Sequence, residues 1–480
     1  MSARDARRDG THDTAPSTGA GHDPAPVVVT THGPVRGERR ASGDRFLGVP
    51  YAAPPVGALR FAPPAPPAPW TEPLDATAYG PTAQRRGFGE GATIPEPTIP
   101  GPGILNLNVF TPAADAGAAL PVLVWIHGGG YVAGSAASPW YDGAAFNRDG
   151  VVLVSLGYRL GIEGFLHLAD APDNRGVRDW LAALEWVRDN IAAFGGDPAR
   201  VTVAGQSAGG GAVQTLLAMP AARGLFRAAI SMSGSLIDPQ ERWVGPAVAE
   251  LFTRRTGVPA TAAALCPLSD DRLLALQDEL TAPGPGRERL PGPLLGPVAD
   301  GELIPRPTLT ELTEGTLAAD IPLLLGHTRH EFHAFGGQEL TDLVFRGPAL
   351  ALARARARRA HPTWLYEFAW PTPVPGATQG LAFHCLDLPF AFDLLGAEGV
   401  AAAAGDSPPQ PLADAMHAAW VSFVRDLDPG GGWPRHTAGR HTTRIWDDEP
   451  ARHTGDHGRN RPLRAPRATP RTPTAPVRAP

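Results

Sequence analysis

The feature that most constrains the fold is a short stretch in which an apolar strand turns directly into a helix at a serine. Residues 201–204 are β-branched and small apolar residues, and residues 212–219 are helix-forming. Ser207 lies between them in a Gly-x-Ser-x-Gly pentapeptide. Because Gly205 and Gly209 have no Cβ atom, strand and helix can approach closely and hold the serine in a strained, exposed pose. The pattern predicts a strand–turn–helix unit that presents a nucleophile.

The pentapeptide alone is weak support for a nucleophile. The chain has 56 glycines in 480 residues, and chance places a serine between two such glycines somewhere in a chain of this kind in roughly one case in five. The interpretation therefore depends on whether the sequence also supplies a base, an acid and an anion site.

Short apolar runs recur along the chain, as is typical of a parallel sheet covered on both faces. Besides 201–204, they lie at residues 122–126, 151–155, 228–232 and 323–325. Residues 177–194 carry apolar side chains at spacings of three and four, which predicts an amphipathic helix that ends at Gly195 and the Asp-Pro pair after it. The alternation predicts an α/β fold with a mostly parallel central sheet and helices on both faces.

Composition favours one large folded unit between two polar ends. The strand and helix pattern runs without a linker, so we expect a single domain over residues 27–450. Residues 1–26 and 451–480 are rich in Pro, Thr, Ala and Gly, and we expect both segments to be disordered. The C-terminal segment is also rich in Arg, for which a solvated tail is the simpler interpretation and a polyanion-binding arm the alternative.

Charge and cysteine content exclude several classes of partner. The formal net charge of -6 gives no indication of a nucleic-acid partner. The chain has two cysteines, Cys266 and Cys385, in unrelated contexts, so no disulfide framework is expected. No apolar stretch resembles a secretory signal in the first 26 residues, and no run approaches a membrane span. We expect a cytoplasmic protein without a membrane partner, secreted only if the start is misassigned.

A glycine run after the first long apolar strand predicts an anion site. The sequence His-Gly-Gly-Gly occupies residues 127–130. Consecutive glycines let backbone N–H groups converge, and the oxyanion formed in acyl transfer needs several such donors beside the nucleophile. A flexible turn is the alternative, but this run and a serine turn occur together in α/β-hydrolases. We expect the N–H groups of Gly129, Gly130 and Ala208 to be the donors.

A serine needs a base near neutral pH, usually an imidazole, and in this type of fold the acid and then the histidine follow the serine along the chain. Glu331 lies in a loop after the run 323–325, where a surface glutamate is the alternative. The histidines in suitable order are His333, His361, His384, His417 and those nearer the C-terminus. His384 lies in a loop after the apolar strand 364–368, where open α/β sheets have their sites.

Three histidines around the acid, His327, His330 and His333, raise the alternative of a metal site. Their spacing does not match that of zinc-binding helices. We therefore expect no metal and no other cofactor.

Together these motifs resemble the type-B carboxylesterases, the α/β-hydrolases that include the cholinesterases, and suggest a bacterial member. The likeness covers about residues 30–450 and rests on the serine pentapeptide and on residues 46–57, 105–109, 127–130, 158–161 and 194–198. The resemblance matches Ser207 to the nucleophile, Glu331 to the acid and His384 to the histidine. It implies a serine carboxylesterase in which His384 carries the proton from Ser207 to the leaving alcohol while Glu331 orients it.

The resemblance also implies a small-molecule ester substrate and a monomer or small homo-oligomer. An acyl hydrolase of amides, lactones or thioesters, or a non-catalytic binding protein on the same fold, is the alternative. Choline esters are not expected, because no tryptophan lies between residues 71 and 124 to bind the ammonium group.

Four departures from the family pattern carry expectations. Arg60 is expected to have lost the acidic partner that is usual in the family, whereas Arg159 is expected to pair with Asp179. Gln206 replaces the commoner glutamate. After Glu331 the lid-like helical region is shortened, which predicts an open pocket with weak selectivity for acyl-chain length.

Overall fold

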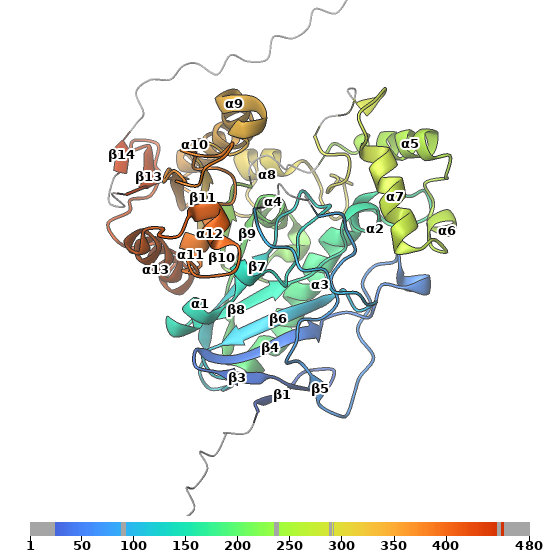
Figure 1. Ribbon diagram of the computed structural model, residues 1–480, viewed down its shortest axis with the longest axis horizontal. Helices are drawn as coiled ribbons and strands as arrows, with labels where there is room; N and C mark the ends of the chain where they lie inside the picture. Colours follow the sequence, from blue (N-terminus) through green and yellow to red (C-terminus); the bar gives the residue numbers. More distant parts are fainter. Residues whose placement is uncertain are drawn as a thin grey trace, which may run out of the picture.

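A mixed sheet of eleven strands forms the centre of the protein (Figure 1), in the order β14-β13-β12-β11-β10-β9-β7-β8-β6-β4-β3. The computed structural model describes residues 25–87, 93–234, 240–287, 290, 292–448 and 453–455. The strands are β3 (Glu38–Arg40), β4 (Gly43–Pro50), β6 (Asn106–Thr111), β7 (Leu120–Ile126), β8 (Val152–Leu156), β9 (Gly196–Gln206), β10 (Ala228–Met232), β11 (Leu323–Thr328), β12 (Thr363–Phe368), β13 (Thr442–Trp446) and β14 (His453–Gly455).

Strands β7 to β13 pair parallel with one another, whereas β3, β4, β6 and β14 form antiparallel pairs at the two ends of the sheet. A separate small sheet has the order β1-β2-β5. Its strands are β1 (Val27–Val29), β2 (Pro34–Arg36) and β5 (Leu74–Asp75). The mostly parallel central sheet predicted from the apolar runs is therefore confirmed.

Helices connect the parallel strands and cover both faces of the sheet. They are α1 (Ala144–Arg148), α2 (Gly161–Phe165), α3 (Arg175–Asn190), α4 (Ala208–Leu217), α5 (Val244–Thr256), α6 (Ala262–Leu265), α7 (Asp270–Thr281), α8 (Thr308–Glu314), α9 (His333–Thr341), α10 (Gly347–Arg358), α11 (Leu388–Ala391), α12 (Val400–Ala404) and α13 (Gln410–Asp426). A π-helix, η7 (Asp342–Arg346), joins α9 to α10. Helices α5, α6 and α7 form a group at one side of the molecule (Figure 1).

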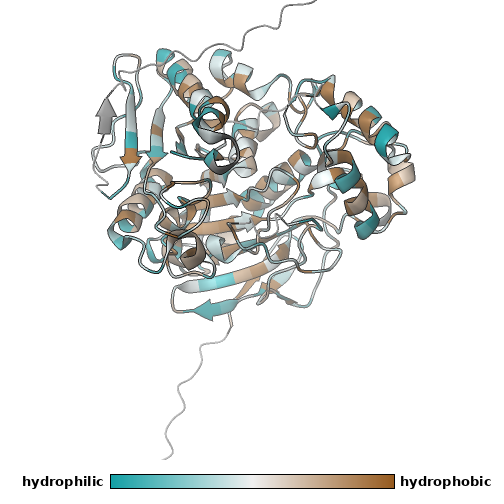
Figure 2. Cartoon of the chain, turned by 45° about the horizontal axis from the view of Figure 1, so that its top comes forward, coloured by the Kyte–Doolittle hydropathy of each residue, from teal (hydrophilic) through white to brown (hydrophobic). Residues whose placement is uncertain are grey.

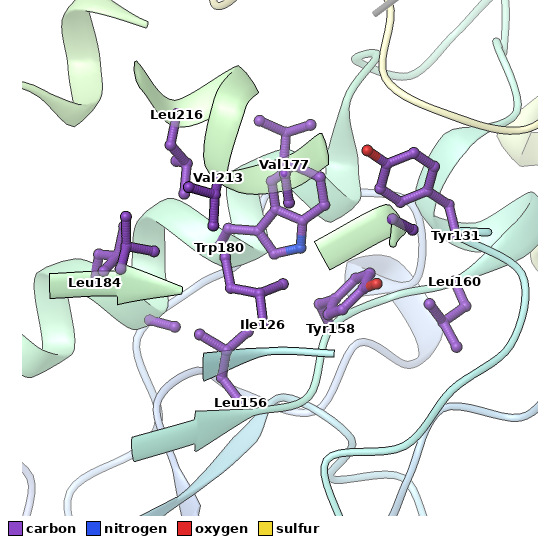
Figure 3. Close-up of a cluster of buried hydrophobic side chains, with 14 of the residues drawn as sticks. Ile126, Tyr131, Leu156, Tyr158, Leu160, Val177, Trp180, Leu184, Val213 and Leu216 are labelled. Atoms are coloured by element: carbon purple, nitrogen blue, oxygen red, sulfur yellow. The ribbon is translucent and has the colours of Figure 1, made fainter. Parts of the chain in front are cut away.

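The core has two layers, because successive side chains of a strand point to opposite faces. In β7, Val124 and Ile126 belong to the layer that includes Trp180 of α3. Leu123 and Trp125 belong to the other layer, with side chains of α1 and α13. Figure 3 shows Trp180 close to Ile126 and to the apolar side chains of α4. In Figure 2 apolar residues concentrate on the central strands, while hydrophilic stretches lie on the outer helices. Continuous apolar strands are thus covered on both sides.

The helix predicted over residues 177–194 is present with a change near its end. Helix α3 ends at Asn190, and a 3-10 turn, η4 (Ile191–Phe194), follows it. Gly195 then adopts the left-handed conformation with φ 87°, as expected of a glycine that ends a helix. The Asp-Pro pair expected in this turn instead lies in the first residues of β9.

Arg60, which is expected to have lost the family's usual acidic partner, is paired with other carboxylates. Its Nε lies 2.6 Å from Oε1 of Glu163 in α2, and its guanidinium also donates to Asp270 of α7. These carboxylates come from helices remote in sequence. The predicted pair of Arg159 with Asp179 is confirmed, with N–O distances of 2.7 and 2.9 Å between side chains that are both buried.

The expected disordered segments fall largely outside the described residues. Residues 1–24 and 456–480 are not described, and within the expected C-terminal tail the backbone of β14 pairs antiparallel with β13. The carboxyl ends of the parallel strands lie at one edge of the central sheet. The loops that follow β7, β9, β11 and β12 therefore meet at this edge. Ser207, Glu331 and His384 all lie in these loops.

Candidate active site

Ser207 lies in the turn between β9 and α4, as the sequence predicts. Its backbone has φ 56° and ψ -123°, a conformation that residues other than glycine seldom adopt. A Cβ atom on Gly205 would lie 2.4 Å from the carbonyl oxygen of Gly209, and a Cβ atom on Gly209 would lie 1.9 Å from that of Ile126. The turn is held by the Ser207 N–H, which donates to the Met232 carbonyl at 2.8 Å. Only glycine therefore fits at positions 205 and 209.

The glycine run after β7 lies against this turn. A Cβ atom on Gly128 would lie 3.1 Å from Cβ of Ser207, so the run and the serine are in direct contact. Gly129 and Gly130 have φ 113° and 60°, which glycine adopts without strain. Within the described residues, the N–H groups of Gly129, Gly130 and Ala208 donate to no acceptor. The glycine run and the residue after Ser207 thus contain three N–H groups without an acceptor in the described part of the chain.

His127, at the start of the glycine run, contacts the run and Tyr158. One ring nitrogen, Nδ1, donates to the Gly128 carbonyl at 2.8 Å, and the Tyr158 hydroxyl donates to the His127 carbonyl at 3.1 Å. The two rings stack with their centroids 4.6 Å apart. Burial lowers the pKa of His127 to about 4, so its imidazole is neutral around pH 7 and shapes the loop without adding charge.

Glu331 and His384 are joined by side-chain and backbone contacts, although 53 residues separate them. The His384 Nδ1–H donates to Oε2 of Glu331, and the His384 N–H donates to the Glu331 carbonyl at 3.2 Å. The Thr328 N–H donates to Oε1 of Glu331 at 2.8 Å. The Glu331 side chain is fully buried and that of His384 is 13% exposed. The carboxylate thus fixes the imidazole with Nδ1 as the donor.

The environment sets the charge of this pair. Burial by itself raises the pKa of Glu331, but the neighbouring His384 more than offsets this and brings it below its ordinary value. Burial lowers the pKa of His384, whereas Cys385 and Glu331 raise it, so that it lies well above its ordinary value. The pair therefore combines an ionised carboxylate with a strongly basic imidazole.

The other ring nitrogen of His384 faces the serine turn. Its Nε2 lies 3.3 Å from Nε2 of Gln206, the residue immediately before Ser207. In the described part of the chain no hydrogen bond joins the Ser207 hydroxyl to His384. Such contacts are commonly long in unliganded enzymes and shorten when substrate binds. The structure brings the imidazole to the turn without a direct bond to the serine.

Sequence reasoning missed two aromatic side chains and a second acid near His384. Phe332 and Phe345 lie against its ring, with centroids 4.7 and 5.2 Å away. Asp387, three residues after His384, is fully buried and accepts from the Tyr366 hydroxyl at 2.9 Å. Phe332 directly follows Glu331, and Asp387 lies three residues after His384, so the sequence positions of both indicated a place near the site. Phe345 had none, because its contact depends on how the helices after Glu331 pack.

Two of the three histidines around Glu331, His327 and His330, bind backbone groups, whereas the buried Nδ1 of His333 has no hydrogen-bond partner among the described residues. The His327 Nδ1 lies 3.0 Å from the Thr328 carbonyl, and the His330 Nδ1 accepts from the Ala382 N–H at 2.9 Å. Among the described residues, no three His, Cys, Asp or Glu side chains are grouped so as to hold a metal ion. We therefore assign no metal ligands to this region.

Comparison with known proteins identifies the family. Residues 24–340 match the sequence model of the Carboxylesterase family. A para-nitrobenzyl esterase of Bacillus subtilis (strain 168) is 36% identical over 473 residues, which cover 88% of this chain and 95% of that protein. The chain belongs to the carboxylesterase family. This esterase is therefore an enzyme that hydrolyses carboxylic esters of small molecules, and the family predicted from its motifs is confirmed.

Other relatives agree with this assignment. A fumonisin B1 esterase of Sphingopyxis macrogoltabida is 33% identical to the esterase over 86% of this chain and 85% of that protein. The crystal structure of a Geobacillus stearothermophilus carboxylesterase superimposes with a TM-score of 0.77 at 34% identity, covering 90% of this chain and 98% of that chain. The α/β-hydrolase fold is thus shared along nearly the whole length. Among the described residues, no helix has the length and apolar character needed to span a membrane.

Proposed function

We propose that the esterase acts through a covalent acyl-enzyme on Ser207, with His384 as general base and acid and Glu331 as the residue that orients it. The hydrogen bond from Nδ1 of His384 to the buried Glu331 carries this proposal, because it leaves Nε2 without a proton and facing the serine turn. The strained conformation of Ser207 gives further support, since nucleophiles of this fold occupy such a turn.

The reaction has two halves in this proposal. The Ser207 Oγ bonds to the ester carbonyl carbon while its proton passes to Nε2 of His384. The bond to the alcohol oxygen then breaks, and the alcohol leaves with that proton. In the second half water gives a proton to Nε2 and attacks the acyl carbon, and the proton returns to Oγ as the acid leaves. Glu331 stays ionised and stabilises the protonated ring.

The N–H groups of Gly129, Gly130 and Ala208 are the proposed donors to the oxyanion. They lie beside Ser207 and have no other acceptor among the described residues. Losing one donor of this kind typically lowers the rate by about 10² to 10³. The backbone atoms cannot be deleted by ordinary substitution, so their role is tested through loop variants such as Gly129→Ala, which adds a Cβ at a left-handed position.

The substrate is proposed to be a small ester with little restriction on its acyl chain, because the helical region after Glu331 is shortened. The monomer or small homo-oligomer and the cytoplasmic location remain predictions from the sequence.

Labelling with a fluorophosphonate probe tests the nucleophile. The folded esterase is treated with the probe and digested, and the modified peptide is identified by mass spectrometry. We expect the label on Ser207, its loss in Ser207→Ala, and its retention in the control Ser422→Ala, which removes a hydroxyl from α13. Hydrolysis of p-nitrophenyl acetate should fall by several orders of magnitude in Ser207→Ala only. Full ester hydrolysis by folded Ser207→Ala would overturn the proposal.

A further inference from the structure

Gln206 has an unusual set of contacts for a fully buried amide. It is the last residue of β9 and has no exposed surface. Its Nε2 lies 3.3 Å from Nε2 of His384, whereas its Oε1 has no hydrogen-bond partner among the described residues. A Cβ atom on Gly128 would lie 3.0 Å from this Oε1, so the amide is enclosed between the glycine run and the imidazole. A buried acceptor without a partner is costly and calls for a reason.

The protonation of His384 defines what the amide can do. Because Nδ1 carries the proton that is donated to Glu331, Nε2 of the neutral ring has a lone pair and no proton. The Gln206 amide N–H is a donor and therefore suits the neutral ring. It does not suit the protonated ring, whose Nε2–H would face another donor. The contact thus favours one protonation state of the imidazole.

We propose that Gln206 is a positioning residue for His384: its amide donates to Nε2 and holds the ring beside the Ser207 turn in the neutral form that accepts a proton. This inference rests on the proposed role of His384. Because Nε2 has a single lone pair, the amide has to release it when the Ser207 hydroxyl takes its place.

The other groups around the His384 ring include titratable side chains that affect its protonation. Glu331, from the loop after β11, is bound at Nδ1, and Cys385 and Asp387 are titratable neighbours on the segment of His384 itself. Farther back, His327 of β11 acts on Glu331, and Tyr366 of β12 binds Asp387. Of these groups, Glu331 and Cys385 favour the protonated ring. The apolar rings of Phe332, from the loop after β11, and Phe345 of η7 cover His384 without adding charge.

Two substitutions separate the donor from its alternatives. Gln206→Glu keeps the size of the side chain, removes the donor and adds a negative charge facing Nε2. Gln206→Met keeps the length but has neither donor nor charge. Gln379→Glu adds the same charge at an exposed position of the loop before His384 and is the control. For each protein kcat/KM for p-nitrophenyl acetate is measured from pH 5 to 9, with thermal unfolding as a check of folding.

The expected result is a shift of the acid side of the pH profile, where activity falls as the ring becomes protonated. It should move to higher pH by about one unit in Gln206→Glu and by about half a unit in Gln206→Met, and stay in place in Gln379→Glu. At pH 6 Gln206→Glu should then be up to about tenfold slower relative to its own plateau. If Gln206→Met does not fold, Gln206→Leu, which also has neither donor nor charge, takes its place.

An unshifted acid side in folded Gln206→Glu would overturn the inference, and so would a shift to lower pH. These outcomes are distinct from failure of the proposed function, which is judged on the unchanged enzyme. If the fluorophosphonate probe labels Ser207 there and only the Gln206 variants behave normally, His384 remains the base and Gln206 has no positioning role. An equal shift in Gln379→Glu would also overturn the inference, because general charge would then explain it.

Discussion

Asp387 should make the stability of the esterase fall as pH rises through the neutral range. Its carboxyl group is fully buried, accepts from the Tyr366 hydroxyl through Oδ2, and has no partner for Oδ1 among the described residues. Burial, and then the charge of Glu331, raise its pKa from 3.8 to about 7. The folded protein therefore holds a proton over a range in which the unfolded chain has already released it.

The size of the effect follows from this difference. Below pH 3.8 the carboxyl is protonated in both states and contributes nothing. Between the two pKa values the free energy of unfolding falls by about 1.4 kcal/mol per pH unit, and above the folded-state pKa the loss is complete at about 4 kcal/mol. Asp387→Asn still accepts from Tyr366 but cannot ionise. Relative to this variant, the wild-type protein should therefore lose about 2–3 kcal/mol between pH 5 and pH 8.

Urea unfolding followed by tryptophan fluorescence measures this difference. The midpoints of the wild-type protein and Asp387→Asn are compared at pH 5, 6, 7 and 8, with the exposed Asp406→Asn as the control. The gap between wild type and Asp387→Asn should widen with pH in favour of the variant, and the gap to the control should stay constant. A constant gap for Asp387→Asn would show that the buried carboxyl titrates as it does in the unfolded chain, and would refute the reasoning.

Three further changes have defined outcomes. Gly209→Ala places a Cβ atom 1.9 Å from a backbone oxygen of β7 and should abolish folded protein in a thermal-unfolding assay, whereas Gly439→Ala, which has no atom within 4 Å, should unfold normally. Arg159→Leu leaves a buried carboxylate unpaired and should cost about 3–5 kcal/mol in urea unfolding, against less than about 0.5 kcal/mol for the exposed Arg254→Ala. In a series of p-nitrophenyl esters from C2 to C12 the wild-type enzyme should show weak selectivity, and Phe345→Ala should raise the relative kcat/KM of the longest chains; a steep preference in the wild type would contradict the first expectation.

Features carried by neighbouring residues could be predicted from the sequence. The serine turn needs only a strand, two glycines and a helix that follow each other, and all of these occur within residues 201–219. The parallel sheet follows from apolar runs that have no polar face. The pairing of Glu331 with His384 was predicted from the resemblance to the family. Their places in loops after strands agree with it, because parallel strands bring such loops to one edge whatever their separation in sequence.

Contacts between remote segments could not be predicted in this way. Arg60 pairs with Glu163 and Asp270, which lie 103 and 210 residues farther along the chain. The carboxylates replace a partner that the family has elsewhere, so a comparison of motif positions indicated a loss. The physical requirement was only that a buried guanidinium find acidic partners. This requirement determines that the partners of Arg60 are acidic, but it does not determine where they lie in the sequence.

The segment after Glu331 shows why a shortened region need not leave the imidazole uncovered. Helix α9 continues through η7 into α10 without a loop. A π-helical turn holds one more residue than an α-helical turn and so rotates the following side chains relative to the α-helical pattern. In η7 this register leaves Leu343 67% exposed and buries Phe345 against His384. A pattern read at 3.6 residues per turn cannot anticipate that rotation. The enclosure of the ring in this esterase therefore depends on one turn of helix as well as on the length of the missing region.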